Sequence, residues 1–511
     1  MSMNVGINLL EVDGKATPSI QAAPTSVAGF IVRSKRGVPG KVRQVTSFAD
    51  FRDYFGDYDK AAFGAYAVRG FFDNGGSLAY VTRAVATAAS GSVTAATPAT
   101  RDFPSAGAGA TTAITVTAGY RGSPDPGAWG KGISVGITSN SDGTYNLAVQ
   151  YNGVQVELWE KIKFGGVGAE NPLKINDEVA GSKYIVVAIP SAATANPAPT
   201  ASPAFAPLNS GGADDNLDAS GRESDRVAEL QKAVDNRVFD GVDVQLLCCP
   251  ETHDAALVNA ALTYCADRGD CMFVGHTAEN ADADAAKAYG QPLRGDKRYG
   301  AIYFPFIRVS DPLGGFRWIP PTGHVLGVYA RTERERGIWK APAGNAASVN
   351  NALDVKFAIN DVKHTDLVKN GSVNAVRFIA GQGIVVDSSR TLSTNPLWLY
   401  VNVRLLFNFV KSSLKYGLRW VVQEPNDPTL WSKVKYNSVT PFLMGLWRRG
   451  AFGPGAPDKV FSVKVDGENN PPANIQQGIF NVEVYFYPSR PAETVIITVG
   501  QQEGGASASD R

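Results

Sequence analysis

The clearest alternation of apolar and polar positions lies between Asn395 and Gly450. Its first run, NPLWLYVNVRLLFNFVKSSLKYGLRW, repeats apolar residues at helical spacing, so that one face of a helix can meet a core: Leu399, Val403, Leu406, Val410 and Leu414. The following EPNDPTLW supplies a proline break and an aspartate cap, and a second amphipathic run, WSKVKYNSVTPFLMGLWRRG, ends at Gly450. This pattern predicts two helices packed on a core.

The first of these helices carries four cations on another face. Arg404, Lys411, Lys415 and Arg419 follow one another at intervals of seven, four and four residues. At about 100° per residue this spacing stacks the four side chains into one ridge. Such a ridge needs an anionic partner or water, and it is typical of an interaction module rather than of a reaction centre.

β-prone strips lie near both ends of the chain. Residues 4–12, NVGINLLEV, form an extended segment that SIQAAPTS separates from the next apolar run. The tail, NIQQGIFNVEVYFYPSRPAETVIITVG, contains two strands that Pro488 and Pro491 separate, and the second of them resembles a detachable edge strand. The first and last strips are therefore candidate arms.

The region after the first strip predicts a compact α/β unit. VTSFADFRDYFG starts a capped, aromatic-rich helix, AAFGAYAVRGFFDNGG forms a second helix that ends at Asn74, and SLAYVTRAV forms a strand. From about Ala86 the composition shifts to Ala, Ser, Thr, Gly and Pro, which marks a domain boundary. Asp142-Gly143 and Asn152-Gly153 then stand between β-prone runs, so residues 87–220 are predicted to be an antiparallel β insertion.

Regular α/β alternation resumes after the insertion, with helices between the apolar runs DVQLLCCP, CMFVGH and YGAIYFPFIRV. Such alternation implies right-handed crossovers and a doubly wound sheet that is at least partly parallel. We therefore expect a multidomain α/β and α+β chain whose inner core is built from N- and C-terminal parts. The expected segments are an N-terminal arm over residues 1–20, the N-terminal part of the core over 21–86, the β-rich outer insertion over 87–220, an α/β middle domain over 221–390, a C-terminal inner domain over 391–490, and a C-terminal arm and tail over 491–511.

Composition and charge restrict the possible partners. The 511 residues include 49 Lys and Arg against 48 Asp and Glu, so no global field attracts the protein to nucleic acid or to an anionic membrane. The N-terminus lacks a classical signal peptide, and no apolar run reaches the roughly 18 residues of a spanning helix. The four cysteines lie in one short region, which favours a reducing cytoplasm over a disulfide framework. We expect no direct membrane insertion.

Candidate chemistry is sparse. Ser134 lies in a G-x-S-x-G match, but the residues after it continue as strand rather than as the helix that a nucleophile elbow requires. His276 follows an apolar strand, at the edge where open α/β sheets bind ligands, although such a histidine is more often structural. The four histidines show no zinc-ligand spacing, and no phosphate-binding glycine motif follows a strand. We expect no metal and no cofactor.

A short segment of charged residues with alternating sign forms another candidate surface. It is either a face exposed to solvent or a site of contact between subunits. Its charged residues are Arg331, Glu333, Arg334, Glu335 and Arg336.

Several long runs in the same order carry a family resemblance. PFIRVSDPLGGFRWIPPTGHVLGVYARTERERGIWKAPAGN, NAVRFIAGQGIVVDSSRTL and the region from WLYVNVRLLFNFVKSSLKYGLRW to GLWRRGAF closely resemble the sheath protein of contractile phage tails and related injection systems. The opening VTSFADFRDYFG and FFDNGGSLAYVTR look like the same family's first domain. The insertion over residues 87–220 is the main unmatched part.

This resemblance implies a structural subunit rather than an enzyme. Such sheaths stack as hexameric rings around an inner tube, join baseplate and tail-terminator or cap proteins, and contract to drive the tube through a target envelope. Assembly would take place in the cytoplasm, as part of a phage tail or a phage-like particle, without nucleic acid. The sheaths of type VI secretion divide this polypeptide into two separate chains, so a single chain that carries both halves argues against that branch of the family. The choice between a phage tail and a phage-like injection particle stays open.

The resemblance also gives roles to the surfaces identified above. The cationic ridge is expected to face an acidic tube. The terminal strips are expected to add strands to neighbouring subunits: Val5, Ile7, Leu9, Thr494, Val495, Ile496, Ile497 and Val499. Residues 1–86 and 391–511 are expected to form one inner domain. The competing hypothesis is an α/β hydrolase-like enzyme that uses Ser134 or His276.

Overall fold

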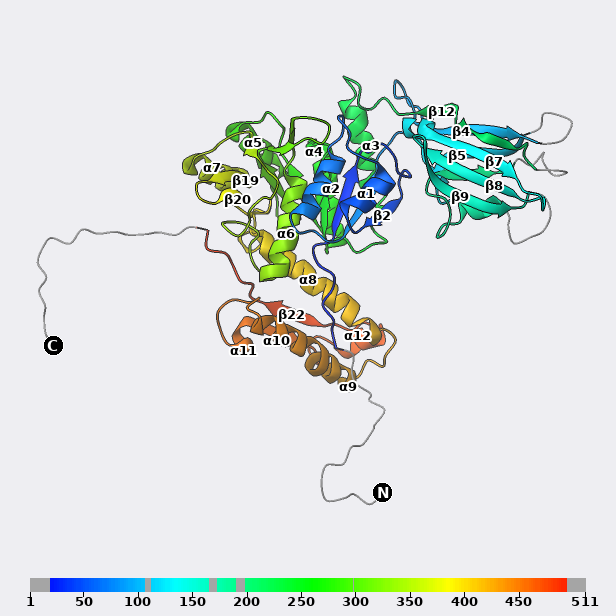
Figure 1. Ribbon diagram of the computed structural model, residues 1–511. Helices are drawn as coiled ribbons and strands as arrows, with labels where there is room; N and C mark the ends of the chain where they lie inside the picture. Colours follow the sequence, from blue (N-terminus) through cyan, green and yellow to red (C-terminus); the bar gives the residue numbers. More distant parts are fainter. Residues whose placement is uncertain (1–18, 106–111, 165–171, 190–197, 297, 494–511) are drawn as a thin grey trace, which may run out of the picture.

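An eight-stranded sheet forms the centre of the computed structural model, which describes residues 19–105, 112–164, 172–189, 198–296 and 298–493 (Figure 1). The strand order is β2-β3-β1-β13-β14-β15-β19-β20. The six strands from β3 to β19 run parallel, while the edge strands β2 and β20 pair antiparallel with their neighbours. The predicted parallel, doubly wound layer is thus present. The bounds of these strands are β1 Ala28–Val32, β2 Val42–Val45, β3 Ala79–Arg83, β13 Leu246–Cys248, β14 Met272–His276, β15 Gly300–Phe304, β19 Val373–Ile379 and β20 Gly383–Val386.

Helices cover both faces of this sheet because its strands are apolar on both sides. Alternate residues of a strand point to opposite faces, so in β13 Leu246 and Cys248 join one core while Leu247 joins the other. The first core is covered by α1 Phe48–Phe55, α2 Gly64–Asp73 and α6 Thr322–Arg336, and the second by α3 Glu223–Asp235, α4 Ala255–Arg268, α5 Ala283–Gly290 and α7 Asp361–Gly371. A small sheet, β17-β16-β18, lies beside α6; its strands are β16 Ile307–Ser310, β17 Phe316–Ile319 and β18 Asp354–Val355.

The insertion is a β-sandwich with a core of its own, as its alternating pattern predicts. One sheet has the order β10-β5-β4-β12, with β6 paired to β5, and the other has the order β11-β7-β8-β9. Both predicted hairpin turns form, with Gly143 at φ +79° and Gly153 at φ +82°. The strands are β4 Thr97–Pro104, β5 Thr112–Tyr120, β6 Ser123–Pro124, β7 Ile133–Ser139, β8 Tyr145–Tyr151, β9 Val154–Ile162, β10 Ile185–Ala188, β11 Ser202–Pro207 and β12 Ser210–Ala213. The antiparallel β insertion is confirmed.

The C-terminal unit is a separate layer below the central sheet in Figure 1, and its long helix α8 leads into it. Its elements are α8 Val401–Gly417, α9 Pro428–Ser432, a π-helical segment Lys433–Val439, α10 Thr440–Arg448, α11 Pro457–Val460, β21 Phe461–Lys464, α12 Pro472–Gln476 and β22 Glu483–Phe486. Asp427 caps α9 through a hydrogen bond from Leu430 N, and Gly450 follows α10 at φ +83°, as predicted. The π-helical segment lies just before Pro441, which cannot donate the usual helical hydrogen bond.

The N-terminal segment is placed differently from our expectation of one inner domain with residues 391–511. Strands β1, β2 and β3 belong to the central sheet, where β1 pairs with β13 of the middle segment. The C-terminal core instead receives Ile20, and Ala23 N donates a hydrogen bond to Ser413 Oγ of α8 at 3.0 Å. Among the described residues, the expected grouping is therefore correct only for those directly before β1, because β1 pairs in parallel with β3 and β13 of the central sheet.

Candidate assembly surfaces

Helix α8 is more completely buried than its amphipathic pattern predicts. It lies between the central sheet and the C-terminal layer, so Val401 and Leu405 join the central core while Leu406 and Val410 join the C-terminal core. As a result, nearly every side chain from residue 401 to residue 410 is buried.

The predicted ridge of four cations is wrong at Arg404. This side chain is 4% exposed, and its guanidinium carbon lies 4.0 Å from the ring centre of Tyr299 and 3.9 Å from that of Trp398. Burial lowers the pKa of Arg404, while the neighbouring Tyr299 acts in the opposite direction. Arg404 is therefore a packing residue held by cation–π contacts, and it does not belong to an exposed surface.

The other three cations are exposed. Lys411 and Lys415 lie on the last turns of α8, and Arg419 follows it in the 3-10 turn Arg419–Val421. Residues 391–493 contain six Lys and five Arg against three Asp and four Glu, so this part of the chain is basic although the whole chain is nearly neutral. Lys411, Lys415 and Arg419 make up what we call the basic surface. Contact with an acidic tube remains a prediction.

A second feature of the C-terminal unit is the two-stranded sheet β21–β22. It pairs Phe461 with Phe486 and Lys464 with Glu483, and among the described residues no third strand joins either outer edge. Its inner side is anchored by Phe486, whose ring centre lies 4.1 Å from that of Phe407. The outer side exposes Tyr485 at 62%. Packing on the C-terminal core holds this pair of strands in place, and strand edges that lack a partner strand can accept a further one.

The last described residue, Glu493, is held firmly where the C-terminal strip begins. Its carboxylate accepts hydrogen bonds from Arg390 at 2.6 and 2.5 Å and from the Tyr400 hydroxyl at 3.3 Å. A bidentate arginine–carboxylate contact fixes direction as well as position. The predicted arm residues themselves, Val5, Ile7, Leu9, Thr494, Val495, Ile496, Ile497 and Val499, lie outside the described residues, so their role stays a prediction.

The charged segment at the end of α6 divides into two groups. Arg331 donates hydrogen bonds to Asn74 O and Ser348 O, and Glu333 accepts one from the Ser26 hydroxyl, so both are used within the subunit. Arg334, Glu335 and Arg336 are exposed, although Arg334 also donates to Gly75 O at 3.1 Å. Only these last three remain available for the predicted subunit contacts.

The residues of the competing enzyme hypothesis lie in different parts of the fold. Ser134 is in β7 of the insertion, paired with Gln150, and the chain continues as strand after it, so the nucleophile elbow does not form. His276 ends β14 of the central sheet and is 2% exposed. Burial, with a smaller contribution from His253, lowers the pKa of His276 to about 3. These two residues do not form a catalytic pair.

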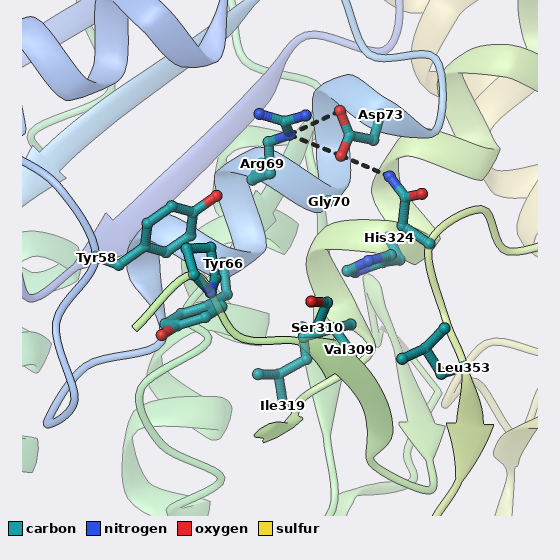
Figure 2. A pocket seen from close by; sticks show the side chains of 12 residues that line it. Tyr58, Tyr66, Arg69, Gly70, Asp73, Val309, Ser310, Ile319, His324 and Leu353 are labelled. Atoms are coloured by element: carbon teal, nitrogen blue, oxygen red, sulfur yellow. Dashed lines mark hydrogen bonds and ion pairs between the residues drawn. The ribbon is translucent and has the colours of Figure 1, made fainter. Parts of the chain in front are cut away.

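A cavity of about 310 Å³ lies between α2, α6 and the β16–β17 hairpin. Figure 2 shows the His324 ring there together with Tyr58, Tyr66 and the Arg69–Asp73 ion pair, in which Arg69 Nε lies 2.7 Å from Asp73. Burial lowers the pKa of His324 to about 4, so the ring is neutral at physiological pH. Within the described structure His324 Nδ1 has no hydrogen-bond partner, so this ring is not paired with a nucleophile that it could activate.

The described residues also lack a metal site and a membrane-spanning helix. They contain no cluster of histidine, cysteine, aspartate and glutamate suited to a metal ion, and Cys248, Cys249, Cys265 and Cys271 are buried as free thiols. In the same part of the chain, no helix combines the length and the apolar character needed to cross a bilayer.

Comparison with known proteins finds similarity to tail sheath proteins. Residues 393–502 match the model of the phage tail sheath C-terminal domain. The tail sheath protein of Vibrio phage KVP40 is 29% identical over 180 residues, which cover 34% of this chain and 25% of that protein. The tail sheath protein of Salmonella phage ViI is 26% identical over 255 residues, covering 48% and 38%. The matches thus span well under half the length of these curated relatives.

The solved structures extend the likeness to the whole fold. The sheath complex of an extracellular contractile injection system, PVC, in its contracted state has a TM-score of 0.59 at 17% identity, covering 98% of this chain and 99% of that one. The matched segments and the fold are thus similar to those of contractile tail sheath proteins. The resemblance stated from the sequence is therefore confirmed, and the mixed, multidomain α/β architecture is that of sheath subunits.

Sequence reasoning missed the β21–β22 pair and the Arg390–Glu493 contact. The strand β22 lies within a β-prone run, but its partner β21 is four residues long and carries no alternation strong enough to mark it. Arg390 and Glu493 are 103 residues apart, and a single pair of opposite charges at that separation gives no periodic signal.

Proposed function

We propose that this protein is the sheath subunit of a contractile phage tail or phage-like injection particle. Subunits polymerise as stacked hexameric rings around an inner tube and contract to drive that tube through a target envelope. The observation that carries the proposal is the open two-stranded sheet β21–β22 in the segment that matches the sheath C-terminal domain.

The open edges of β21–β22 suit strand addition between subunits. A strip from a neighbouring chain adds main-chain hydrogen bonds along an edge, and its alternate side chains meet the two faces of the sheet. The strips at residues 5–10 and 494–499 have the required length and β-prone composition. Arg390 holds Glu493, the residue directly before the C-terminal strip, through two hydrogen bonds. Because such donor and acceptor surfaces differ, the contacts build an open helical lattice rather than a closed dimer.

The basic surface supplies the second interaction, with the inner tube. Lys411, Lys415 and Arg419 are exposed and have no carboxylate partner among the described residues. An acidic tube would supply that partner at every subunit of the lattice. Each exposed ion pair between sheath and tube would contribute only roughly 0–1 kcal/mol to binding. The affinity would therefore come from the repetition of these pairs at every subunit along the tube.

The remaining partners follow from the same assembly. Baseplate proteins would start the lattice, and a terminator or cap protein would end it, during assembly in the cytoplasm. Contraction would draw its free energy from a metastable packing that repacks between two lattice states, so the subunit needs no nucleotide and acts as no enzyme.

Deleting the strips separately tests this proposal. Chains lacking residues 1–18 or residues 494–511 should remain folded but stay monomeric, while the full chain forms tubes under the same conditions. Circular dichroism and thermal unfolding serve as the folding control, and sedimentation measures assembly. Normal tubes from both deletions would refute strand addition as the link between subunits.

A further inference from the structure

The low-complexity borders of the insertion have the composition of flexible linkers, but their described residues next to the central sheet are hydrogen-bonded to each other. At the outgoing border Ala86 N donates a hydrogen bond to Asp215 of the returning border at 2.8 Å. Further along, Thr94 N donates to Asn216 Oδ1 at 2.9 Å, and Asn216 Nδ2 donates to Ser92 O at 2.9 Å. The two crossing segments are thus bonded to each other beside the central sheet.

Two buried arginines of the central sheet extend this connection. Arg33, directly after β1, contacts Asp215 at 2.7 Å and Asp218 at 2.9 Å. Arg83, the last residue of β3, contacts Asp125 at 3.0 Å. The Arg83 side chain is 3% exposed, and the Asp125 and Asp215 side chains are 1% exposed. These charges are therefore removed from solvent at the junction itself.

A third arginine and a group of rings widen the junction. The Arg36 guanidinium lies 4.3 Å from the ring centre of Trp129 and 5.0 Å from that of Tyr184, both in the insertion. To one side, Tyr54 of α1 meets Tyr120 of β5 edge to face, with ring centres 4.4 Å apart. Because these contacts are spread over the junction, they resist rotation of the insertion relative to the central sheet.

We propose that the insertion and the central sheet move as one rigid body, held by an arginine clamp. The clamp consists of Arg33, Arg36 and Arg83 on the central side, and of Asp125, Asp215, Asp218 and Trp129 on the side of the insertion. Swinging the insertion at its borders would separate the buried Arg83–Asp125 and Arg33–Asp215 ion pairs, and the cost of leaving buried charges unpaired opposes this motion. The part of this inference that concerns contraction rests on the proposed function, whereas the rigidity is a property of the single subunit.

Spin labels test the rigidity in the isolated subunit. Ser141→Cys lies in the exposed turn at the end of β7, and Asp267→Cys lies on the exposed side of α4, while the four native cysteines are buried. Pulsed dipolar spectroscopy should give one narrow distance distribution for this pair. Adding Asp125→Ala and Asp215→Ala should broaden it. A broad distribution in the chain with the clamp intact would overturn the proposal, whatever the fold of the clamp variant.

A covalent cross-link then tests whether the junction stays closed during contraction. Lys41 Nζ of the central unit donates to Ser123 Oγ of the insertion at 2.9 Å, so a short bis-maleimide can join Lys41→Cys to Ser123→Cys. Cross-linked tubes should contract as far as uncross-linked tubes of the same variant. Contraction lost only after cross-linking would overturn the rigid-body inference. If the unaltered full-length chain also forms no tubes, the proposed function fails, and the spin-label distribution still decides the rigidity.

Discussion

Replacing Asp125 with alanine removes the only carboxylate that pairs with the buried Arg83 guanidinium among the described residues. The Arg83–Asp125 distance is 3.0 Å, and the second Asp125 oxygen accepts a hydrogen bond from Gly37 N at 2.7 Å. Removing one member of a buried ion pair costs about 3–5 kcal/mol, because the other charge stays buried without a partner. The orphaned Gly37 N–H adds about 1 kcal/mol.

The expected destabilisation is therefore about 4–6 kcal/mol, a large part of a typical stability of about 5–15 kcal/mol. Urea unfolding of the purified subunit, followed by tryptophan fluorescence and circular dichroism, measures it. Asp267→Ala is the matched control, since that aspartate is exposed on α4, and it should change stability by at most about 0.5 kcal/mol. The double variant Arg83→Met/Asp125→Leu should recover part of the loss, because it leaves no unpaired charge. A cost below about 1 kcal/mol for Asp125→Ala would refute the reasoning, since that is the range of an exposed pair.

Two further substitutions test other parts of the structure. Burial raises the pKa of Glu333 from its ordinary 4.5 to about 7, while the Ser26 hydrogen bond acts the other way. The folded state then holds a proton that the unfolded chain releases, so stability should fall as pH rises from about 4.5 to about 7, by up to roughly 3 kcal/mol. Glu333→Gln should flatten this slope in urea unfolding at pH 5 and pH 8, whereas the exposed Glu335→Gln should not; an unchanged slope in Glu333→Gln would contradict the assignment. Lys411→Glu/Lys415→Glu should abolish co-sedimentation with the inner tube while leaving the subunit's melting temperature unchanged, and tube binding equal to that of the unaltered chain would rule out the basic surface.

Local signals in the sequence predicted most of the individual elements. The Asp142-Gly143 and Asn152-Gly153 turns depend on four consecutive residues each, so they could be identified without the rest of the fold. The α8 helix and its apolar stripe were likewise visible in one window. The parallel sheet followed from the alternation of helices with apolar runs, because strands buried on both faces have a distinctive composition.

Contacts between residues that are far apart in the chain give no signal in any short stretch of the sequence. Arg404 matched a cationic ridge by spacing, but its burial depends on Tyr299, which lies more than a hundred residues earlier. Arg33 and Asp215 are 182 residues apart, and nothing in the intervening low-complexity stretches indicates that they meet. The position of residues 21–86 depends on which strand pairs with β1. That pairing is determined by the packing of the whole sheet and not by residues 21–86 alone.

Electron microscopy of the purified full-length chain, alone and after co-expression with its inner tube protein, tests the central claim most directly. A sheath subunit should appear in negative stain as hollow, striated tubes with six-fold rings, and the strip deletions should remove them. Compact, uniform particles from the full-length chain, with and without the tube protein, would contradict the account.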